Sequence, residues 1–321
     1  MNVRKTLKRK RGVPAKPVTV ASLVRSVAAD LKRAKLVFAH GTVDPIAEAA
    51  FIVAETLGIH PHFIAARAEM PVAAAKQKKI ARLVDRRIRT RKPTAYLLKR
   101  IYMLGVPFYI DERAIVPRSF LGEVLASELF AGQSFSLLPD AEAVGSVLDL
   151  CTGSGCLAIL SAMRFRGAKV DAVELSKDAI EVARRNAAEH KLKKRLRVLR
   201  GDLFAPVADK RYDLIISNPP YVDDAGMKGL PPECRHEPAM AFDGGTDGLD
   251  IVRRIIDEAG RHLTRNGGLL CEIGRGREAL ERAYPKLRFL WLDTEESSGE
   301  VFWLDAGQLR GAPAVIPGRS P

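Results

Sequence analysis

The chain has 321 residues, 47% of them hydrophobic, and a formal net charge of +14 at pH 7. Its length allows one large domain and a smaller one. No stretch approaches the roughly 18 apolar residues of a membrane span, and no apolar segment follows the basic N-terminus, so we expect neither a membrane helix nor a secretory signal.

The positive charge lies in the first third of the chain. Residues 1–100 hold 23 of the 52 Lys and Arg but only 6 of the 38 Asp and Glu, so they carry +17 and the remainder carries −3. This asymmetry indicates either a nucleic-acid contact or a solvated basic surface.

The cysteines indicate thiols without a metal. None of the four forms a CxxC pair, and none has a histidine at zinc-like spacing. Cys151, Cys156 and Cys271 lie in or beside apolar runs, which favours buried free thiols. We therefore expect no metal site and a cytoplasmic location.

The N-terminal third reads as a small helical domain. Residues 1–18 are basic and polar and predict a disordered tail, with a transit peptide as the alternative. Apolar spacing predicts a helix over about 21–38, and Asp44-Pro45 predicts the start of a second one that ends at Leu57. A third should follow Pro71. We place this domain at 19–95.

The third helix should be amphipathic. We expect Ile80, Leu83, Val84 and Ile88 to face inward. The basic residues should face largely outward; they are Lys78, Lys79, Arg82, Arg86, Arg87 and Arg89.

After this domain the pattern changes twice. Ile101–Leu104 and Val106–Ile110 flank Gly105 and predict a β-hairpin within a 96–118 linker. Strands and helices then alternate over 119–307, which predicts an α/β domain with a largely parallel sheet, and residues 308–321 read as a tail. The expected strands are 146–150, 169–175, 196–199, 214–217, 268–273, 288–292 and 301–305, with helices at 177–190 and 249–263 among the connections.

A glycine-rich turn follows the first of these strands. Asp149-Leu-Cys-Thr152-Gly153-Ser-Gly155 allows a sharp turn and close ligand approach. Position 158 is alanine where a dinucleotide fingerprint has its third glycine, but some NAD enzymes accept alanine there, so this motif alone does not decide the cofactor.

Carboxylates after the next two strands narrow the choice of cofactor. Glu174 ends the second strand, where it could accept hydrogen bonds from both ribose hydroxyls. Asp202 and Leu203 follow the third strand, where the carboxylate could accept from an adenine amino group while apolar neighbours pack on the ring. Three acids after three successive strands favour a nucleoside-type cofactor.

With these features the sequence resembles the class I S-adenosylmethionine-dependent methyltransferases. The resemblance implies a Rossmann-like, seven-stranded sheet whose last strand is antiparallel. It implies that Gly153 and Gly155 approach the methionine part of the cofactor, that Glu174 holds the ribose and that Asp202 faces the adenine. We also assign Asp149, Thr152, Leu203 and Asn218 to cofactor binding.

The sequence Asn218-Pro219-Pro220-Tyr221 follows the fourth strand. Two prolines stiffen the loop. The Asn218 side-chain oxygen and the Pro219 carbonyl could then accept both hydrogens of one planar –NH2 group, with Tyr221 stacked on its flat face. We assign Asn218, Pro219 and Tyr221 to catalysis, and Pro220, Arg118 and Glu237 to substrate binding.

This loop alone does not specify the substrate, because enzymes acting on glutamine, adenine N6 and guanine N2 share it. The order of helical domain, hairpin and catalytic domain resembles the protein-(glutamine-N5) methyltransferases over about residues 20–305. Further matches are Pro93 with Tyr96, Phe108, Val116-Pro117-Arg118, Glu237-Pro238 and Asp247-Gly248-Leu249.

Within that family, one branch acts on peptide-chain release factors and another on the third protein of the large ribosomal subunit. Leu230–Pro238, Pro117-Arg118-Ser119 and Cys151 look like the ribosomal branch. The resemblance implies a ribosomal-protein substrate, and we expect the basic N-terminal region to contact ribosomal RNA.

Three polar residues near these motifs allow a structural role as well as a functional one. Arg118 could neutralise a carboxylate in the pocket or anchor the hairpin. We expect His236 to fix its loop and Glu272 to have a structural role.

Overall fold

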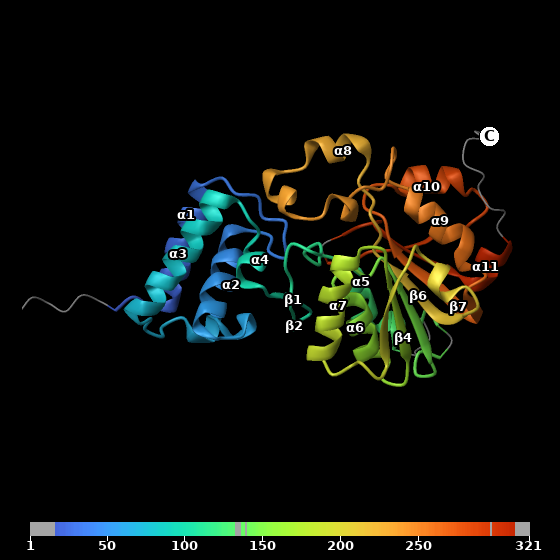
Figure 1. Cartoon of the computed structure of the whole chain (residues 1–321), viewed down its shortest axis with the longest axis horizontal. Coiled ribbons are helices and arrows are strands. Elements are labelled where there is room, and N and C mark those ends of the chain that lie inside the picture. The colour runs from blue at the N-terminus through green and yellow to red at the C-terminus, as the bar shows by residue number, and fades with distance from the viewer. Residues whose placement is uncertain (1–16, 132–135, 139, 296, 312–321) are drawn as a thin grey trace, which may run out of the picture. The chain divides into compact units, whose positions relative to one another are not determined.

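The structure is a computed structural model that describes residues 17–131, 136–138, 140–295 and 297–311. The predicted N-terminal tail up to Lys16 and residues 312–321 of the predicted C-terminal tail lie outside these ranges. By their contacts, the residues form two compact units (Figure 1): one runs to Leu36 and resumes over Asp44–Arg89, and the other comprises Val37–Val43 and the chain from Thr90 onward.

The first unit is helical, as expected. It contains α1 (Val20–Arg33), α2 (Pro45–Leu57) and α3 (Ala74–Thr90), with short 3-10 turns η1 (Pro61–Phe63) and η2 (Ala65–Arg67). Asp44 caps α2 by accepting from the amides of Ile46 and Ala47 at 2.7 and 2.8 Å, which confirms the predicted helix start.

Two predictions for this unit were wrong in detail. Helix α1 ends at Arg33 rather than near Phe38, and Lys35 has a left-handed φ of 50°. Arg87 is buried rather than exposed, because its guanidinium lies 2.7 Å from the buried Glu48 carboxylate. The ion pair compensates the buried charges of both Arg87 and Glu48. The apolar periodicity of the helix could not indicate this partner.

The second unit begins with short elements that precede its sheet. Helix α4 (Thr94–Leu98) leads into the hairpin β1 (Ile101–Met103) and β2 (Val106–Phe108). Leu104 and Gly105 both have positive φ, as a two-residue type I′ turn requires. Helix α5 (Leu121–Ala126) and the turn η3 (Glu128–Phe130) follow.

The sheet has seven strands in the order β5-β4-β3-β6-β7-β9-β8. Neighbouring strands from β5 to β7 pair in parallel, and β9 is antiparallel to both β7 and β8. This confirms the predicted α/β class and the antiparallel last strand. The bounds are β3 Ser146–Leu150, β4 Lys169–Glu174, β5 Leu196–Arg200, β6 Tyr212–Ser217, β7 Leu263–Glu272, β8 Leu290–Leu292 and β9 Val301–Asp305.

Helices cover both faces of this sheet (Figure 1). Side chains alternate along each strand, so Val147 and Leu214 face the core that includes residues of α5, α6 and α7, whereas Leu148 and Ile215 face the core that includes residues of α9, α10 and α11. The helix bounds are α6 Cys156–Arg164, α7 Lys177–Glu189, α8 Asp224–Gly229, α9 Asp250–Ala259, α10 Arg277–Ala283 and α11 Ala306–Gly311.

Several boundaries differ from the predictions. Helix α9 ends at Ala259, and Leu263 already belongs to β7, which starts five residues before the predicted strand. Helix α11 includes Gln308–Gly311, where a tail was expected. Three further 3-10 turns follow β5 and β6: η4 (Ala205–Val207), η5 (Pro232–His236) and η6 (Ala239–Ala241). No helix within the described ranges is long and apolar enough to cross a membrane.

Candidate active site

The glycine-rich turn lies between β3 and α6. Cys151, Gly153 and Gly155 have φ values of +57°, +54° and +81°. A Cβ at Gly155 would lie 3.1 Å from the Cβ of Ala183, so this position needs glycine both for its backbone conformation and for packing against α7. The turn therefore brings its backbone to the carboxyl edge of the sheet.

Glu174 connects this turn to the loop after β4. One of its carboxylate oxygens accepts from the Gly153 amide at 2.8 Å, and the other accepts from the Ser176 amide at 2.9 Å. Each carboxylate oxygen can accept a second hydrogen bond. Glu174 thus orders the loop and still has capacity for a pair of ligand hydroxyls.

The loop after β5 supplies Asp202 and Leu203. Leu203 is buried and has a φ of +45°, while Asp202 forms an ion pair with Arg254 at 2.7 Å. Together these loops enclose a cavity of about 250 Å³, which Cys151, Gly153, Glu174, Asp202, Leu203 and Asn218 help to line. We call it the cofactor cavity.

Neither Asp149 nor Thr152 lines the cofactor cavity, and Thr152 lines the neighbouring cavity described next. Thr152 donates its hydroxyl to one oxygen of the fully buried Asp149, whose other oxygen has no partner among the described residues. Burial raises the pKa of Asp149 to about 7. Their contacts support the turn, and a direct cofactor contact by either residue stays a prediction.

A second cavity of about 290 Å³ adjoins the first and shares Ile115, Cys151, Gly153, Asn218 and Ala241 with it. We call it the acceptor cavity. Pro219 and Tyr221 line it, and so does Arg118. Pro220, predicted to bind substrate, lines the cofactor cavity instead.

Asn218 stands where the two cavities meet. Its Nδ2 donates to the backbone carbonyl of Arg118 at 3.3 Å. A carbonyl can only accept, so this contact fixes which end of the amide faces Arg118 and leaves Asn218 Oδ1 available as an acceptor.

Tyr221 is held from behind by Glu272, at the end of β7. The Tyr221 hydroxyl donates to one oxygen of Glu272 at 3.1 Å, while the Ser119 hydroxyl and the Phe120 amide donate to the other at 2.7 and 2.9 Å. Burial raises the pKa of Glu272 to about 7. These contacts agree with the structural role predicted for Glu272.

Arg118 pairs with a carboxylate of the protein itself. Its two terminal nitrogens each lie 3.0 Å from a different oxygen of Glu237, and its guanidinium lies 5.5 Å from the centre of the Phe242 ring. The Glu237 side chain is completely buried, so the substrate contact predicted for it has no support in its surroundings and stays a prediction.

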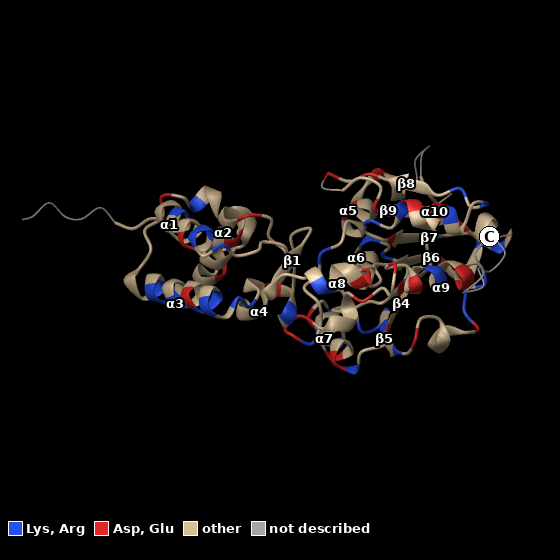
Figure 2. Cartoon of the chain, turned by 90° about the horizontal axis from the view of Figure 1, so that it is seen from above, with Lys and Arg blue, Asp and Glu red and all other residues tan. Residues whose placement is uncertain are grey.

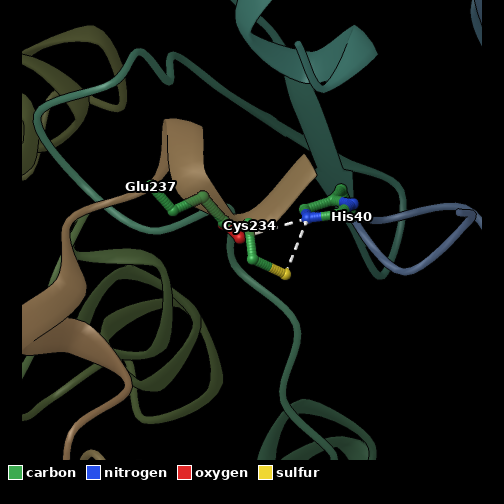
Figure 3. A group of neighbouring side chains, drawn as sticks. All are labelled: His40, Cys234 and Glu237. Carbon is green, nitrogen blue, oxygen red and sulfur yellow. Dashed lines mark hydrogen bonds and ion pairs between the residues drawn. The ribbon is translucent and has the colours of Figure 1, made fainter. Parts of the chain in front are cut away.

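His40 also contacts Glu237, with Nε2 3.1 Å from a carboxylate oxygen and 3.6 Å from the Cys234 Sγ (Figure 3). Sequence reasoning missed His40 because nothing in its local pattern marks it. His236, in contrast, contacts the Thr90 carbonyl at 2.8 Å, in line with the loop-fixing role expected for it.

These features define a class of protein: a class I S-adenosylmethionine-dependent methyltransferase. The loops fit the cofactor, because the cofactor cavity combines a glycine turn with carboxylates after β4 and β5.

Comparison with known proteins supports this class and identifies the family. The family model described as the methyltransferase small domain matches residues 127–229, and the PrmC N-terminal domain matches residues 28–98. A ribosomal protein uL3 glutamine methyltransferase from Bradyrhizobium diazoefficiens is 58% identical over 91% of this chain and 92% of its own. One from Burkholderia pseudomallei is 45% identical over 92% and 96%. The chain belongs to the family of ribosomal protein uL3 glutamine methyltransferases.

Proposed function

We propose that the chain transfers the methyl group of S-adenosylmethionine to the side-chain amide nitrogen of a glutamine in ribosomal protein uL3. The relatives described above carry this activity in their names. The observation that carries the chemistry is the fixed orientation of Asn218, whose Nδ2 is engaged by the Arg118 carbonyl.

The acceptor amide needs two hydrogen-bond acceptors. A primary amide has two N–H groups in one plane, and Asn218 Oδ1 with the Pro219 carbonyl would accept one each. This pairing would aim the nitrogen at the cofactor cavity. Orientation of reacting atoms can contribute roughly 7–11 kcal/mol to lowering a barrier.

When bound, S-adenosylmethionine supplies an electrophilic methyl group on a sulfonium centre. The acceptor nitrogen forms the new C–N bond, the C–S bond breaks, and one amide proton leaves; the products are N-methylglutamine and S-adenosylhomocysteine. The protein's part is to orient the amide and to accept hydrogen bonds from it as positive charge develops on nitrogen.

The acceptor cavity suits a neutral amide. Among the described residues that line it there is no carboxylate and no histidine. Burial raises the pKa of the Cys156 thiol to about 12 and also raises that of Cys234. With the thiols protonated near pH 7, the cavity provides orientation rather than a strong base.

The test uses methyl-labelled S-adenosylmethionine and ribosomes from cells that lack the gene. Label on one large-subunit protein that survives nuclease and is recovered as methylglutamine is the expected result. Label lost to nuclease would move the acceptor to RNA. In a parallel reaction with purified release factor, label on that protein but none on the ribosomes would move the acceptor to the other branch of the family.

We also propose that the basic N-terminal region contacts ribosomal RNA. Helix α3 exposes Lys78, Lys79, Arg82 and Arg86, of which Lys78, Arg82 and Arg86 recur every four residues, and basic residues are frequent along it (Figure 2). Such a stripe suits a phosphate backbone. We place the reaction in the cytoplasm, where the ribosomal substrate is made.

The RNA proposal has its own test. Replacing Arg82 and Arg86 by Glu should weaken binding to assembling large subunits and reduce its salt dependence, with activity on free uL3 unchanged. Arg265 and Arg282, exposed arginines of the other unit, replaced by Glu give the matched control. Equal salt dependence for both double variants would contradict the proposal.

A further inference from the structure

The Glu237 carboxylate is contacted by three residues of the second unit, in two segments of the chain. One carboxylate oxygen accepts from the Val116 amide at 2.9 Å and from Arg118 Nη1 at 3.0 Å. The other accepts from Arg118 Nη2 at 3.0 Å and contacts His40 Nε2 at 3.1 Å. Burial works to raise the pKa of this carboxyl, but His40 and Arg118 hold it below its usual value, so Glu237 is ionised.

Through these bonds Glu237 holds the chain on both sides of Pro117. Proline has no N–H group, so Pro117 cannot donate to the carboxylate. Val116 and Arg118, on either side of it, supply the donors instead. The carbonyl of Arg118 is the group that accepts from Asn218 Nδ2. The hydrogen bonds of Glu237 and the Val116–Arg118 backbone between them therefore connect Glu237 to the Asn218 amide.

His40 completes the set of donors around Glu237 (Figure 3). Its side chain is only 3% exposed, and its Nδ1 has no partner within the part of the chain that the structure describes. A buried ring nitrogen without a partner destabilises a folded protein, and an apolar side chain of similar size would avoid that cost. The Nε2 contact with Glu237 is therefore the benefit that histidine brings to this position.

A metal ion is the competing explanation, because ligand atoms of His40, Cys234 and Glu237 all lie within 4.8 Å of one another. However, the four bonds described above already use the accepting positions of the Glu237 carboxylate. The pKa of Cys234 is raised by burial, which favours a thiol over the thiolate that binds metals. The observations favour a hydrogen-bonded cluster.

We propose that His40 is a positioning residue for methyl transfer: through Glu237 it fixes the Arg118 carbonyl that orients the Asn218 amide. The proposal rests on the proposed function for its kinetic consequence. His40 and Glu237 line neither the cofactor cavity nor the acceptor cavity, so they act on the reaction through the residues they contact, of which Val116, Arg118 and Cys234 line the acceptor cavity.

The test compares His40→Met, which removes the N–H, with His40→Gln, which can return an N–H near the same place. We expect His40→Met to lower kcat on uL3 about 10- to 100-fold, the range for a lost hydrogen bond to a charged group. Expressed per molecule able to bind S-adenosylmethionine, KM for the cofactor should change less than about twofold. His40→Gln should recover most of kcat.

The matched control is His190, whose Nε2 contacts the Pro107 carbonyl at 2.8 Å in the same unit. His190→Met and His190→Gln should leave kcat per binding-competent molecule unchanged. Equal losses for His40→Met and His40→Gln, or a loss found only in the fraction of competent molecules, would mean that His40 merely supports folding. One zinc per chain, lost in Cys234→Ser, would overturn the proposal in favour of a metal site.

A readout that needs no protein substrate separates this proposal from the proposed function. With [15N]asparagine labelling, the side-chain NH2 signals of Asn218, identified by their absence in Asn218→Ala, should shift in His40→Met and return toward wild type in His40→Gln. Unmoved signals would refute the positioning path even if uL3 is methylated. Moved signals with no methylation of uL3 would refute the substrate assignment instead.

Discussion

The cofactor cavity and the acceptor cavity lie side by side but are built in different ways. The cofactor cavity is made largely by loops that follow β3, β4, β5 and β6, where the parallel strands of one sheet end together. The acceptor cavity also uses the glycine-rich turn and the loop after β6, but it adds η5 and the Val116–Ser119 segment. Arg118, in that segment, lies 100 positions before Asn218 in the sequence.

The polar contacts follow the same division. Glu174 bridges residues 21 and 2 positions away. Glu237 and Glu272 reach Val116 and Ser119 across 121 and 153 positions. The loops at the edge of the sheet thus form the cofactor cavity, while two buried carboxylates hold together distant segments that form the acceptor cavity. Substitutions on the two sides should therefore differ in kind.

The largest effect should come from Asn218→Ala. Removing the acceptor oxygen while keeping the loop should lower kcat about 10²- to 10³-fold, because the amide is no longer aligned or stabilised as charge develops. The dissociation constant for S-adenosylmethionine, measured by calorimetry, should change much less. Exposed Asn266, replaced by Ala, is the control. A loss of cofactor affinity without a loss of kcat would contradict the assignment of Asn218 to the acceptor cavity.

The pH dependence of stability tests the surroundings of Glu272, behind the acceptor cavity. Its pKa of about 7 in the folded protein exceeds the ordinary value of 4.5, so its protonated form stabilises the fold below pH 4.5, and this stability is lost as pH rises through about 7. Relative to Glu272→Gln, the wild-type free energy of unfolding should fall by about 3 kcal/mol between pH 4.5 and 7.5.

Urea unfolding at several pH values measures this difference. Glu278→Gln, at an exposed position in α10, should give a difference that does not change with pH. A flat difference for Glu272→Gln as well would mean that the carboxyl is not held in an apolar setting behind Tyr221.

Glu174→Gln tests the cofactor side. The glutamine can present its oxygen to only one of the Gly153 and Ser176 amides, and its NH2 group must face the other. We expect S-adenosylmethionine to bind about 10- to 100-fold more weakly, with kcat at saturating cofactor within a few-fold of wild type. The exposed Glu189→Gln serves as control. A large fall in kcat at saturation would show that the two sides are coupled.

The smallest effect concerns backbone strain at Cys151, which touches both cavities. Because its φ is +57°, Cys151→Gly should be more stable than Cys151→Ala by about 1 kcal/mol. At Cys271, within β7, the order should reverse, since glycine weakens a strand interior. Thermal unfolding of the four variants measures both orders; the same order at both sites would exclude strain at Cys151.

The sequence could predict those features that depend on residues close together in the chain. Strand alternation, the Asp44 cap and the acids after successive strands are local signals, and each predicted strand has a counterpart in the sheet. The Asn218 loop was predicted as an acceptor site from chemistry that lies within four consecutive residues. The assignment of individual site residues remains a set of predictions for the variants above.

The features that the sequence did not predict depend on contacts between residues far apart in the chain. The residues next to Arg87 in the sequence do not indicate that it pairs with Glu48. Those next to His40 do not indicate that it contacts Glu237. The early start of β7 at Leu263 extends through a polar stretch that strand periodicity does not mark. In each case a tertiary partner decides the conformation or burial, and a single sequence contains no record of that partner.

The assignment of Val37–Val43 to the second unit matters for the design of truncated proteins. These residues precede α2 in the sequence, yet His40 contacts Glu237, and the Val37 amide donates to Glu233. Cutting the gene before Thr90 to isolate the catalytic unit would therefore also remove part of its interior. A fairer deletion would keep residues 37–43, join them to Thr90 through a Gly/Ser linker, and discard only the helices on either side.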